Sequence, residues 1–330
     1  MIRKIDWYGL EAVEFSKGDY TAMLIPSVGG NLVRLANTKL GVEILRTPTA
    51  EEVETFKSRP QIFGLPLLFP PNRIENGRYE FEGRTYQYPI TIEKEQNYHH
   101  GIIKGEPFVV SKVEEDDEAI KVECRYYSNV ANDAIYKDFP HAFKCKIVYK
   151  LSAKGLKQEV VFSNRSEQNM PVGVGFHTPI VIPFAGGEAS DYLMRVAVGE
   201  QVELSERNLP TGKTLPLSEK WAKLREGGLQ TTDCEPLEAG FTLREIEVDG
   251  KSYRGAVVEN TKTGVKVFYE VDDKTTYWTL WNNGGQVNYC CPEPQSWTTN
   301  APNAADPKAA GFVAIEPGEK WKAVYKLYCK

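Results

Sequence analysis

Apolar and polar residues alternate with a period of two along several stretches of the chain. Over residues 143–151 the odd positions are apolar or aromatic and the even positions are mostly lysine. The same alternation recurs over residues 120–126 and 265–271. Because successive side chains of a strand point to opposite faces, this pattern predicts strands with one buried face and one face in water.

Turn and helix signals complete this picture. Residues 79–86 predict a hairpin that turns at Glu82-Gly83. Helical signals are few and short: Thr49 and Glu52 have the spacing of a capping box, and Ser218 is placed to cap a helix over 219–225. The chain shows no internal repeat, low-complexity tract or Pro/Ser-rich linker. We therefore predict an all-β protein of large antiparallel sheets that forms a single domain over residues 1–330.

Composition narrows the classes of function. The 330 residues carry 40 Lys and Arg against 45 Asp and Glu, a net charge of -5 without long blocks of either sign, so nucleic acid is not an expected partner. No apolar run has the length of a signal peptide or a membrane span, so we expect a cytoplasmic protein without a membrane partner. The six cysteines contain no Cys-x-x-Cys pair and are expected to be reduced thiols: Cys124, Cys145, Cys234, Cys290, Cys291 and Cys329.

Several common motifs fail on inspection. The Gly173-Val-Gly175 segment has Thr178 where a dinucleotide fingerprint needs its third glycine, and the Gly212-Lys-Thr segment lacks the earlier glycine of a phosphate-binding loop. No nucleophile elbow and no His-Glu-x-x-His motif is present. His141 and Cys145 would share one face of a strand, but two ligands without a third do not indicate a metal site.

His177 is one of only four histidines, and it lies in the stiff segment 171–179 (PVGVGFHTP). The glycines let the backbone approach its neighbours closely, and the prolines fix its direction. An imidazole held in this way can exchange a proton near neutral pH. The alternative interpretation is a buried histidine that is hydrogen-bonded and inert.

Three further segments present a polar group from a rigid backbone, as a preorganised site requires. Asn72 and Arg73 follow a proline-rich apolar run, His100 precedes Gly101, and Glu293 stands between two prolines. Taken singly, Arg73 could form a surface ion pair, His100 could be a turn residue and Glu293 could be a solvated carboxylate in a loop.

The order and local contexts of these four segments resemble the galactose mutarotase, or aldose 1-epimerase, family. The resemblance covers nearly the whole chain. It implies a β-supersandwich in which large antiparallel sheets pack together and a sugar binds in a cleft on a concave face. It extends to the segments 28–32 (VGGNL), 41–45 (GVEIL), 77–79 (GRY) and 316–319 (EPGE).

The resemblance also implies a reaction, the interconversion of the α and β anomers of a free aldose. This reaction needs a base for the anomeric hydroxyl and an acid for the ring oxygen; Glu293 matches the family's base, and His177 matches its acid. Asn72, Arg73 and His100 match residues that bind the sugar. The family needs no metal, nucleotide or covalent intermediate, so we expect no cofactor and a monosaccharide as the only partner. Monomer and homodimer both remain open.

Two positions depart from the family pattern. His99 stands where the family usually has an apolar residue, so His99 rather than His100 could be the one that reaches the site. The family's aspartate for the sugar hydroxyls is best matched by Asp233 in the segment 229–234, where the usual following aromatic residue is missing. The second departure leaves the identity of the sugar open.

Two other functions compete with this one. The first is a sugar-binding or sensing protein that keeps the cleft without turnover. The second is a hexose-phosphate mutarotase, which would need a basic cluster near the far end of the sugar. Arg78 and Arg84 are near Arg73 in sequence, although the predicted hairpin turns them toward water. Trp278 and Trp281 could offer an aromatic face to a sugar ring, but a tryptophan of this kind is more often part of the core, so we leave both out of the site.

Overall fold

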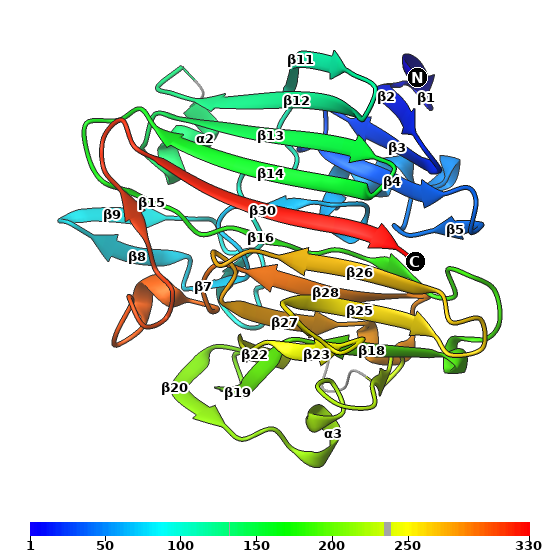
Figure 1. Ribbon diagram of the computed structural model, residues 1–330. Coiled ribbons are helices and arrows are strands. Elements are labelled where there is room, and N and C mark those ends of the chain that lie inside the picture. The colour runs from blue at the N-terminus through cyan, green and yellow to red at the C-terminus, as the bar shows by residue number, and fades with distance from the viewer. Residues whose placement is uncertain (132, 234–238) are drawn as a thin grey trace.

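Antiparallel strands dominate the computed structural model, which describes residues 1–131, 133–233 and 239–330 (Figure 1). Strands make up 49% of the residues and helices 9%, which confirms the all-β class. The largest sheet has nine strands. In order across that sheet they are β11 (Val109–Glu115), β12 (Ala119–Ser128), β13 (Phe143–Ser152), β14 (Gly155–Asn164), β30 (Lys320–Cys329), β26 (Lys266–Val271), β25 (Gly255–Asn260), β18 (Tyr192–Val196) and β21 (Leu229–Gln230).

A second sheet has eight strands and carries most of the candidate site. Its order is β20 (Pro210–Leu215), β19 (Val198–Leu204), β22 (Ala239–Leu243), β27 (Tyr277–Trp281), β28 (Tyr289–Gln295), β16 (Gly175–Phe176) and β6 (Leu67–Leu68), with β17 (Ile180–Val181) also paired to β28. The N-terminal sheet has five strands in chain order, namely β1 (Ile2–Trp7), β2 (Leu10–Lys17), β3 (Tyr20–Ile25), β4 (Asn31–Asn37) and β5 (Val42–Glu43).

The remaining strands of the described ranges form two-stranded ribbons, and the helices are short. The ribbons are β7 (Arg73–Glu75) with β10 (Asn97–His99), β8 (Arg78–Phe81) with β9 (Arg84–Gln87), β15 (Met170–Pro171) with β29 (Ala314–Ile315), and β23 (Ile246–Val248) with β24 (Lys251–Tyr253). The helices are α1 (Val53–Ser58), α2 (Asp133–Asp138) and α3 (Glu219–Ala222), and the 3-10 helices are η1 (Ala50–Glu52), η2 (Pro60–Ile62), η3 (Ala189–Asp191), η4 (Asn283–Gly285) and η5 (Ala301–Asn303).

The predicted strands and hairpin are confirmed. The stretches 120–126 and 143–151 lie within β12 and β13, and 265–271 corresponds to β26, which begins one residue later. In the hairpin β8–β9, Phe81 pairs with Arg84. Glu82 and Gly83 form the turn with φ of 48° and 74°, the left-handed pair that a two-residue hairpin turn needs.

The predicted helix starts are also confirmed, but one helix is shorter than expected. The Glu52 carboxylate accepts a hydrogen bond from the Thr49 N–H at 3.1 Å, and the Ser218 hydroxyl accepts one from the Trp221 N–H at 3.3 Å. The second helix, α3, ends at Ala222, and residues 223–227 form turns that lead through two glycines at positive φ into β21.

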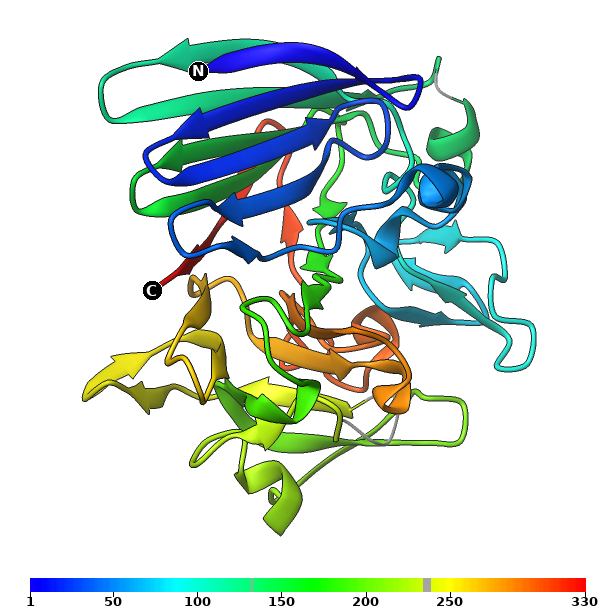
Figure 2. The ribbon, with the colours of Figure 1, turned by 90° about the vertical axis from the view of Figure 1, so that its right-hand side faces the viewer.

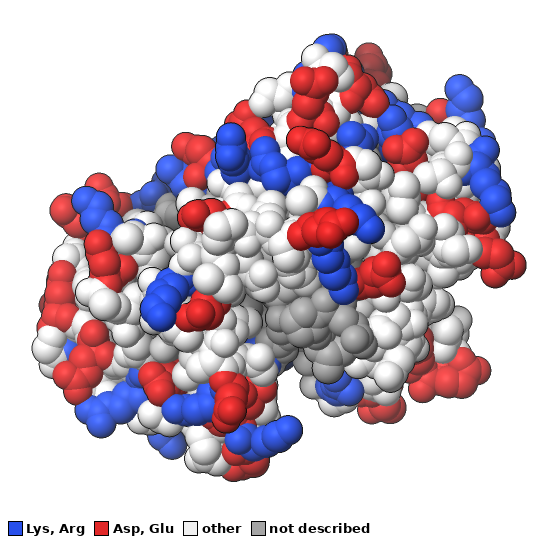
Figure 3. Space-filling view, turned by 90° about the horizontal axis from the view of Figure 1, so that it is seen from below, with Lys and Arg blue, Asp and Glu red and all other residues white. Residues whose placement is uncertain are grey.

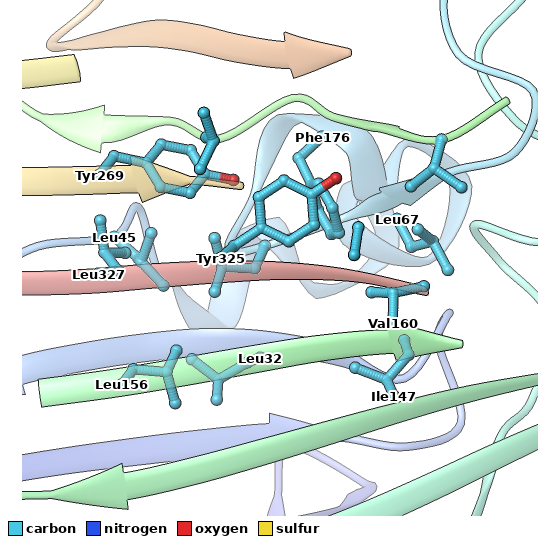
Figure 4. Close-up of a cluster of buried hydrophobic side chains, with 14 of the residues drawn as sticks. Leu32, Leu45, Leu67, Ile147, Leu156, Val160, Phe176, Tyr269, Tyr325 and Leu327 are labelled. Carbon is cyan, nitrogen blue, oxygen red and sulfur yellow. The ribbon is translucent and has the colours of Figure 1, made fainter. Parts of the chain in front are cut away.

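The large sheets enclose one main core. Leu32, Ile147, Val160, Phe176 and Tyr325 come from five different strands and are each at most 1% exposed. Figure 4 shows these side chains converging between the strands. Burying a side chain of this size stabilises the fold by roughly 1.5–3 kcal/mol. The alternate positions of β12 and β13 carry the lysines and other polar groups toward solvent, as the period-two pattern predicted.

The N-terminal sheet covers the outer part of the nine-stranded sheet. Strand β2 contacts β12 and β13, β3 contacts β13, and Figure 2 shows the two sets of strands packed face to face. The eight-stranded sheet lies at the other end of the molecule (Figure 1). Within this sheet, β19, β20 and β22 lie farthest out, whereas β16 and β28 lie toward the middle of the structure (Figure 1).

The surface charges shown in Figure 3 and the buried cysteines do not indicate a second functional site among the described residues. Lys and Arg are interspersed with Asp and Glu on the face shown in Figure 3, and neither sign dominates it. In the described part of the chain, no helix has the length and apolar character to cross a membrane. Cys124, Cys145 and Cys329 are buried free thiols, whereas Cys234 lies outside the described residues.

Candidate functional site

Glu293 lies inside strand β28 and not in a loop. It pairs with Thr279 of β27 across the sheet, and only 2% of it is exposed. A carboxylate at such a position has lost most of its hydration, which is costly unless other groups interact with it. The alternative of a solvated loop carboxylate is therefore wrong.

The strand ladder is interrupted beside Glu293. In the pairing of the described strands, β28 meets β16 at Gln295 and meets β17 at Cys290, and the stretch between them has no ladder partner on that side. Pro292 and Pro294 fall in this stretch, where their missing N–H groups leave no ladder hydrogen bond unmade. The link from β16 to β17 carries His177 to this gap.

His177 and Glu293 form the centre of the site. Nε2 of His177 lies 3.3 Å from Oε1 of Glu293, and His177 is 5% exposed. Burial is the main cause that lowers the pKa of His177 to about 4; a backbone hydrogen bond opposes this shift, and the charge of Arg59 adds to it. The imidazole is thus neutral at pH 7. It contacts the ring of Trp281, with ring centroids 5.4 Å apart.

His100 presents a second imidazole to the first. Its ring is perpendicular to that of His177, with centroids 5.6 Å apart. His100 has a left-handed φ of 60°, and its N–H donates to the carbonyl of Asn72 at 3.1 Å. The Lys104 ammonium donates to the His100 carbonyl and, at 3.1 Å, to that of Gly101. These bonds hold a backbone conformation that is unfavourable for a residue with a side chain.

Both neighbouring histidines reach the site. His99 is half-buried, and its ring lies 3.4 Å from that of His100, centroid to centroid. Burial lowers the pKa of both imidazoles well below the ordinary value, so both are neutral at pH 7. His100 is the one grouped with His177 and Glu293.

Asn72 and Arg73 are fixed by bonds to each other and to their neighbours. The Asn72 amide donates to the Thr279 hydroxyl at 3.3 Å and accepts from the Arg73 N–H at 2.9 Å. Arg73 is 3% exposed, and its Nε donates to Glu95 at 2.5 Å. Although burial raises the pKa of Glu95, hydrogen bonds from Arg73 and Asn208 bring it below its ordinary value. The alternative of a surface ion pair for Arg73 is therefore wrong.

These groups surround a cavity of about 180 Å³. This volume lies below the roughly 300–1,000 Å³ of sites for drug-sized ligands and suits a small polar molecule. Gln61, His100 and His177 each carry a buried polar side-chain atom without a hydrogen-bond partner among the described residues. Such atoms cost roughly 1–3 kcal/mol each unless a ligand or water satisfies them. The lining consists of Arg59, Gln61, Ile62, Asn72, His99, His100, His177, Thr279, Trp281 and Glu293.

The structure brings most of the predicted site residues together. Asn72, His100, His177 and Glu293 line the cavity; Arg73 is adjacent to Asn72 in the chain but does not line it. Asp233 is exposed and is not among the lining residues, so its role stays a prediction.

Sequence reasoning missed Arg59, Gln61, Thr279 and Trp281. Trp281, which we left out of the site, lines the cavity, whereas Trp278 is fully buried. Strand alternation offered a signal, because positions 279 and 281 share the face opposite to Trp278. No local pattern marks Arg59, whose proximity to His177 arises only from the tertiary fold.

Three residues of the site, His100, His177 and Glu293, could also hold a metal ion. Ligand atoms of His100, His177 and Glu293 lie within 4.8 Å of one another, and all three side chains are buried. Two neutral imidazoles and a carboxylate are ligands that divalent transition metals accept.

Comparisons with known proteins agree with the resemblance. Residues 11–328 match the sequence profile of the family described as aldose 1-epimerase. The chain is 24% identical over 288 residues to the galactose mutarotase of Rattus norvegicus, covering 82% of this chain and 79% of the rat protein. It is 25% identical over 202 residues to YihR of Escherichia coli, covering 61% of this chain and 59%, less than two thirds, of YihR.

Solved structures give the same assignment. A galactose mutarotase-like protein from Clostridium acetobutylicum superposes with a TM-score of 0.96 at 38% identity, covering 100% of this chain and 98% of the other. A galactose 1-epimerase from Lactobacillus acidophilus shares the fold with a TM-score of 0.73 at 15% identity, covering 100% of this chain and 98% of the other. The profile match spans nearly the whole chain, and the protein belongs to the aldose 1-epimerase family.

Proposed function

We propose that the protein is an aldose 1-epimerase, which interconverts the α and β anomers of a free monosaccharide. The observation that carries the proposal is the buried Glu293 carboxylate 3.3 Å from the buried imidazole of His177, in a cavity of about 180 Å³. A base and an acid placed this close can act on the anomeric hydroxyl and the ring oxygen, because both of these oxygens are bonded to C1.

In the proposed reaction, Glu293 takes the proton of the anomeric hydroxyl while His177 gives a proton to the ring oxygen. The bond between C1 and the ring oxygen breaks, and C1 becomes an aldehyde carbon. Rotation about the C1–C2 bond turns the other face of the aldehyde to the hydroxyl. Reclosure returns both protons, so no group is consumed. Each such proton transfer contributes roughly 10²- to 10⁴-fold to the rate.

The reaction fixes where the proton of the pair resides. During the reaction, His177 and Glu293 share one transferable proton. It is on His177 when the closed sugar is bound and on Glu293 when the ring is open. In the empty site, burial favours the neutral imidazole. The adjacent carboxylate favours the imidazolium because opposite charges stabilise each other. Sugar binding must therefore select the protonated form of His177.

The remaining lining residues would bind the sugar. His100 and Gln61 carry unsatisfied buried atoms that can pair with hydroxyl groups. Trp281 offers an apolar face of the kind that packs against the C–H groups of a sugar ring. Arg73, fixed by Glu95, would contribute positive charge beside Asn72.

Polarimetry on freshly dissolved glucose, galactose and a panel of other aldoses tests the proposal. We expect the optical rotation to reach equilibrium faster than in buffer alone for at least one sugar. Mutarotation no faster than in buffer across the panel would reject the proposal.

A sugar-binding protein without turnover is the second candidate. It is favoured by the exposed position of Asp233, outside the cavity that it was expected to line. Calorimetric binding of a sugar together with no catalysis would support this candidate, and the absence of any binding would eliminate it.

A further inference from the structure

Arg59 is the one cationic side chain among the residues that line the cavity. It lies between α1 and η2, where its backbone is held in place. Its N–H donates to the carbonyl of Thr55 at 2.7 Å, and the next residue, Pro60, is buried. The side chain itself is exposed, so a fixed backbone presents a solvent-accessible guanidinium at the cavity.

The charges around Arg59 are already paired with each other. Glu52 forms an ion pair with Arg46, and Glu54 forms one with Lys57 at 2.7 Å. Arg59 makes no side-chain hydrogen bond or ion pair with any residue in the described ranges. A guanidinium that lines a cavity without an acidic partner is available for an anionic group of a ligand.

Arg59 lines the same cavity as His177 and Glu293. Its charge reaches His177, whereas the charges of Arg73 and Lys104 reach His99 and His100. In the proposed reaction, His177 serves the ring oxygen. The ring oxygen is bonded to two carbons. One is C1, whose hydroxyl group Glu293 deprotonates, and the other is the carbon that bears C6. We therefore orient the sugar with its C6 substituent toward the guanidinium of Arg59.

We propose that Arg59 binds an anionic group on C6, which makes the substrate an aldose with a carboxylate or a phosphate at that carbon. This inference rests on the proposed function for the orientation of the sugar. It also explains why the cavity has a cation that the acid–base chemistry does not use.

The two arginines that sequence reasoning named for a phosphosugar do not take this role. Arg78 is exposed and pairs with Glu80 at 2.6 Å, and Arg84 donates to the Pro140 carbonyl at 2.7 Å. Neither lines the cavity. A single guanidinium matches one carboxylate in a two-pronged hydrogen bond, so a sugar acid suits the site better than a phosphate dianion.

The test compares matched sugars in the full-length protein. NMR exchange between anomeric protons gives kcat/KM for galactose and galacturonate, and for glucose, glucuronate and glucose 6-phosphate. The readout is the ratio of kcat/KM for the anionic sugar to that for its neutral partner. A general loss of folding or activity cancels in this ratio.

We expect Arg59→Gln to lower the ratio by about 10- to 100-fold, the size of a charge-assisted hydrogen bond. Arg59→Lys should restore part of it, and Arg78→Gln, which removes an exposed guanidinium outside the cavity, should not change it. A fall with the uronates only assigns a carboxylate, and a fall with glucose 6-phosphate only assigns a phosphate. An unchanged ratio for every pair in Arg59→Gln would overturn the inference.

Failure of the proposed function would be recognised separately. If no sugar is turned over, calorimetry with galactose and galacturonate decides the inference alone. Tighter binding of galacturonate that disappears in Arg59→Gln would uphold it. Equal binding of the two sugars, or a preference that persists in Arg59→Gln, would reject it.

Discussion

Replacing Glu293 by glutamine removes the proposed base with little change of shape. The amide has nearly the same volume as the carboxylate, so β28 keeps its packing against Thr279. Because His177 is neutral in the empty site, the substitution leaves no buried partner charge unpaired. The variant should therefore fold, and urea unfolding should confirm that before activity is measured.

The loss should appear in kcat. A general base contributes roughly 10²- to 10⁴-fold, and each factor of ten corresponds to about 1.36 kcal/mol, so the barrier should rise by roughly 2.7–5.4 kcal/mol. An amide still forms hydrogen bonds with a hydroxyl group. The dissociation constant for the sugar should consequently change much less than kcat.

Polarimetry after rapid dissolution of a pure anomer measures kcat, and calorimetry measures binding. Glu316→Gln is the matched control, because Glu316 is an exposed carboxylate in the turn before β30. The control should retain wild-type turnover. A Glu293→Gln variant that turned over as fast as wild type would refute the assignment of the base, and one that lost binding together with turnover would point to a role in holding the sugar.

His177 and the packing around Trp297 give three further tests. His177→Ala should lower kcat by roughly 10²- to 10⁴-fold and largely spare binding; normal turnover would restore the inert-histidine interpretation. Because burial lowers the pKa of His177 to about 4, the unfolded chain binds a proton there that the folded chain does not, and resistance to urea should decrease as the pH falls from 6.5 toward 4. A pH-independent midpoint over this window would contradict that reasoning. Gly173→Ala should destabilise the protein by about 1–3 kcal/mol, because the new Cβ would lie 2.2 Å from ring carbons of Trp297. Gly105→Ala, where a Cβ meets nothing within 4 Å, is the control for the same urea measurement.

Local patterns predicted the parts of the fold that local physics controls. The alternation over 143–151 corresponds to a strand because each side chain there meets either the core or water. The hairpin turned where two residues could adopt positive φ. The order of the strands across the sheets depends on contacts between distant segments, and no period in the sequence encodes it.

The candidate site was predictable only in part. The rigid settings of His177 and Asn72 marked them as candidates, and both line the cavity. A loop position was an open alternative for Glu293, and the two flanking prolines argue against the middle of a sheet, where proline is rare. The gap in the ladder removes that objection, and only the pairing of β16 and β17 reveals the gap. Arg59 is likewise recognisable only from its position in the folded chain.

The long sequence separation within the site has a consequence for folding. Asn72 and Thr279 are hydrogen-bonded across 207 positions of sequence, and both line the same cavity. Contacts of such long range form slowly because closing the intervening loop costs entropy before any contact repays it. Segments from both halves of the chain must therefore meet before the cavity is formed. If the proposed mutarotation is found, its recovery after dilution from denaturant should lag behind the formation of the strands, and its return would then report the last step of assembly.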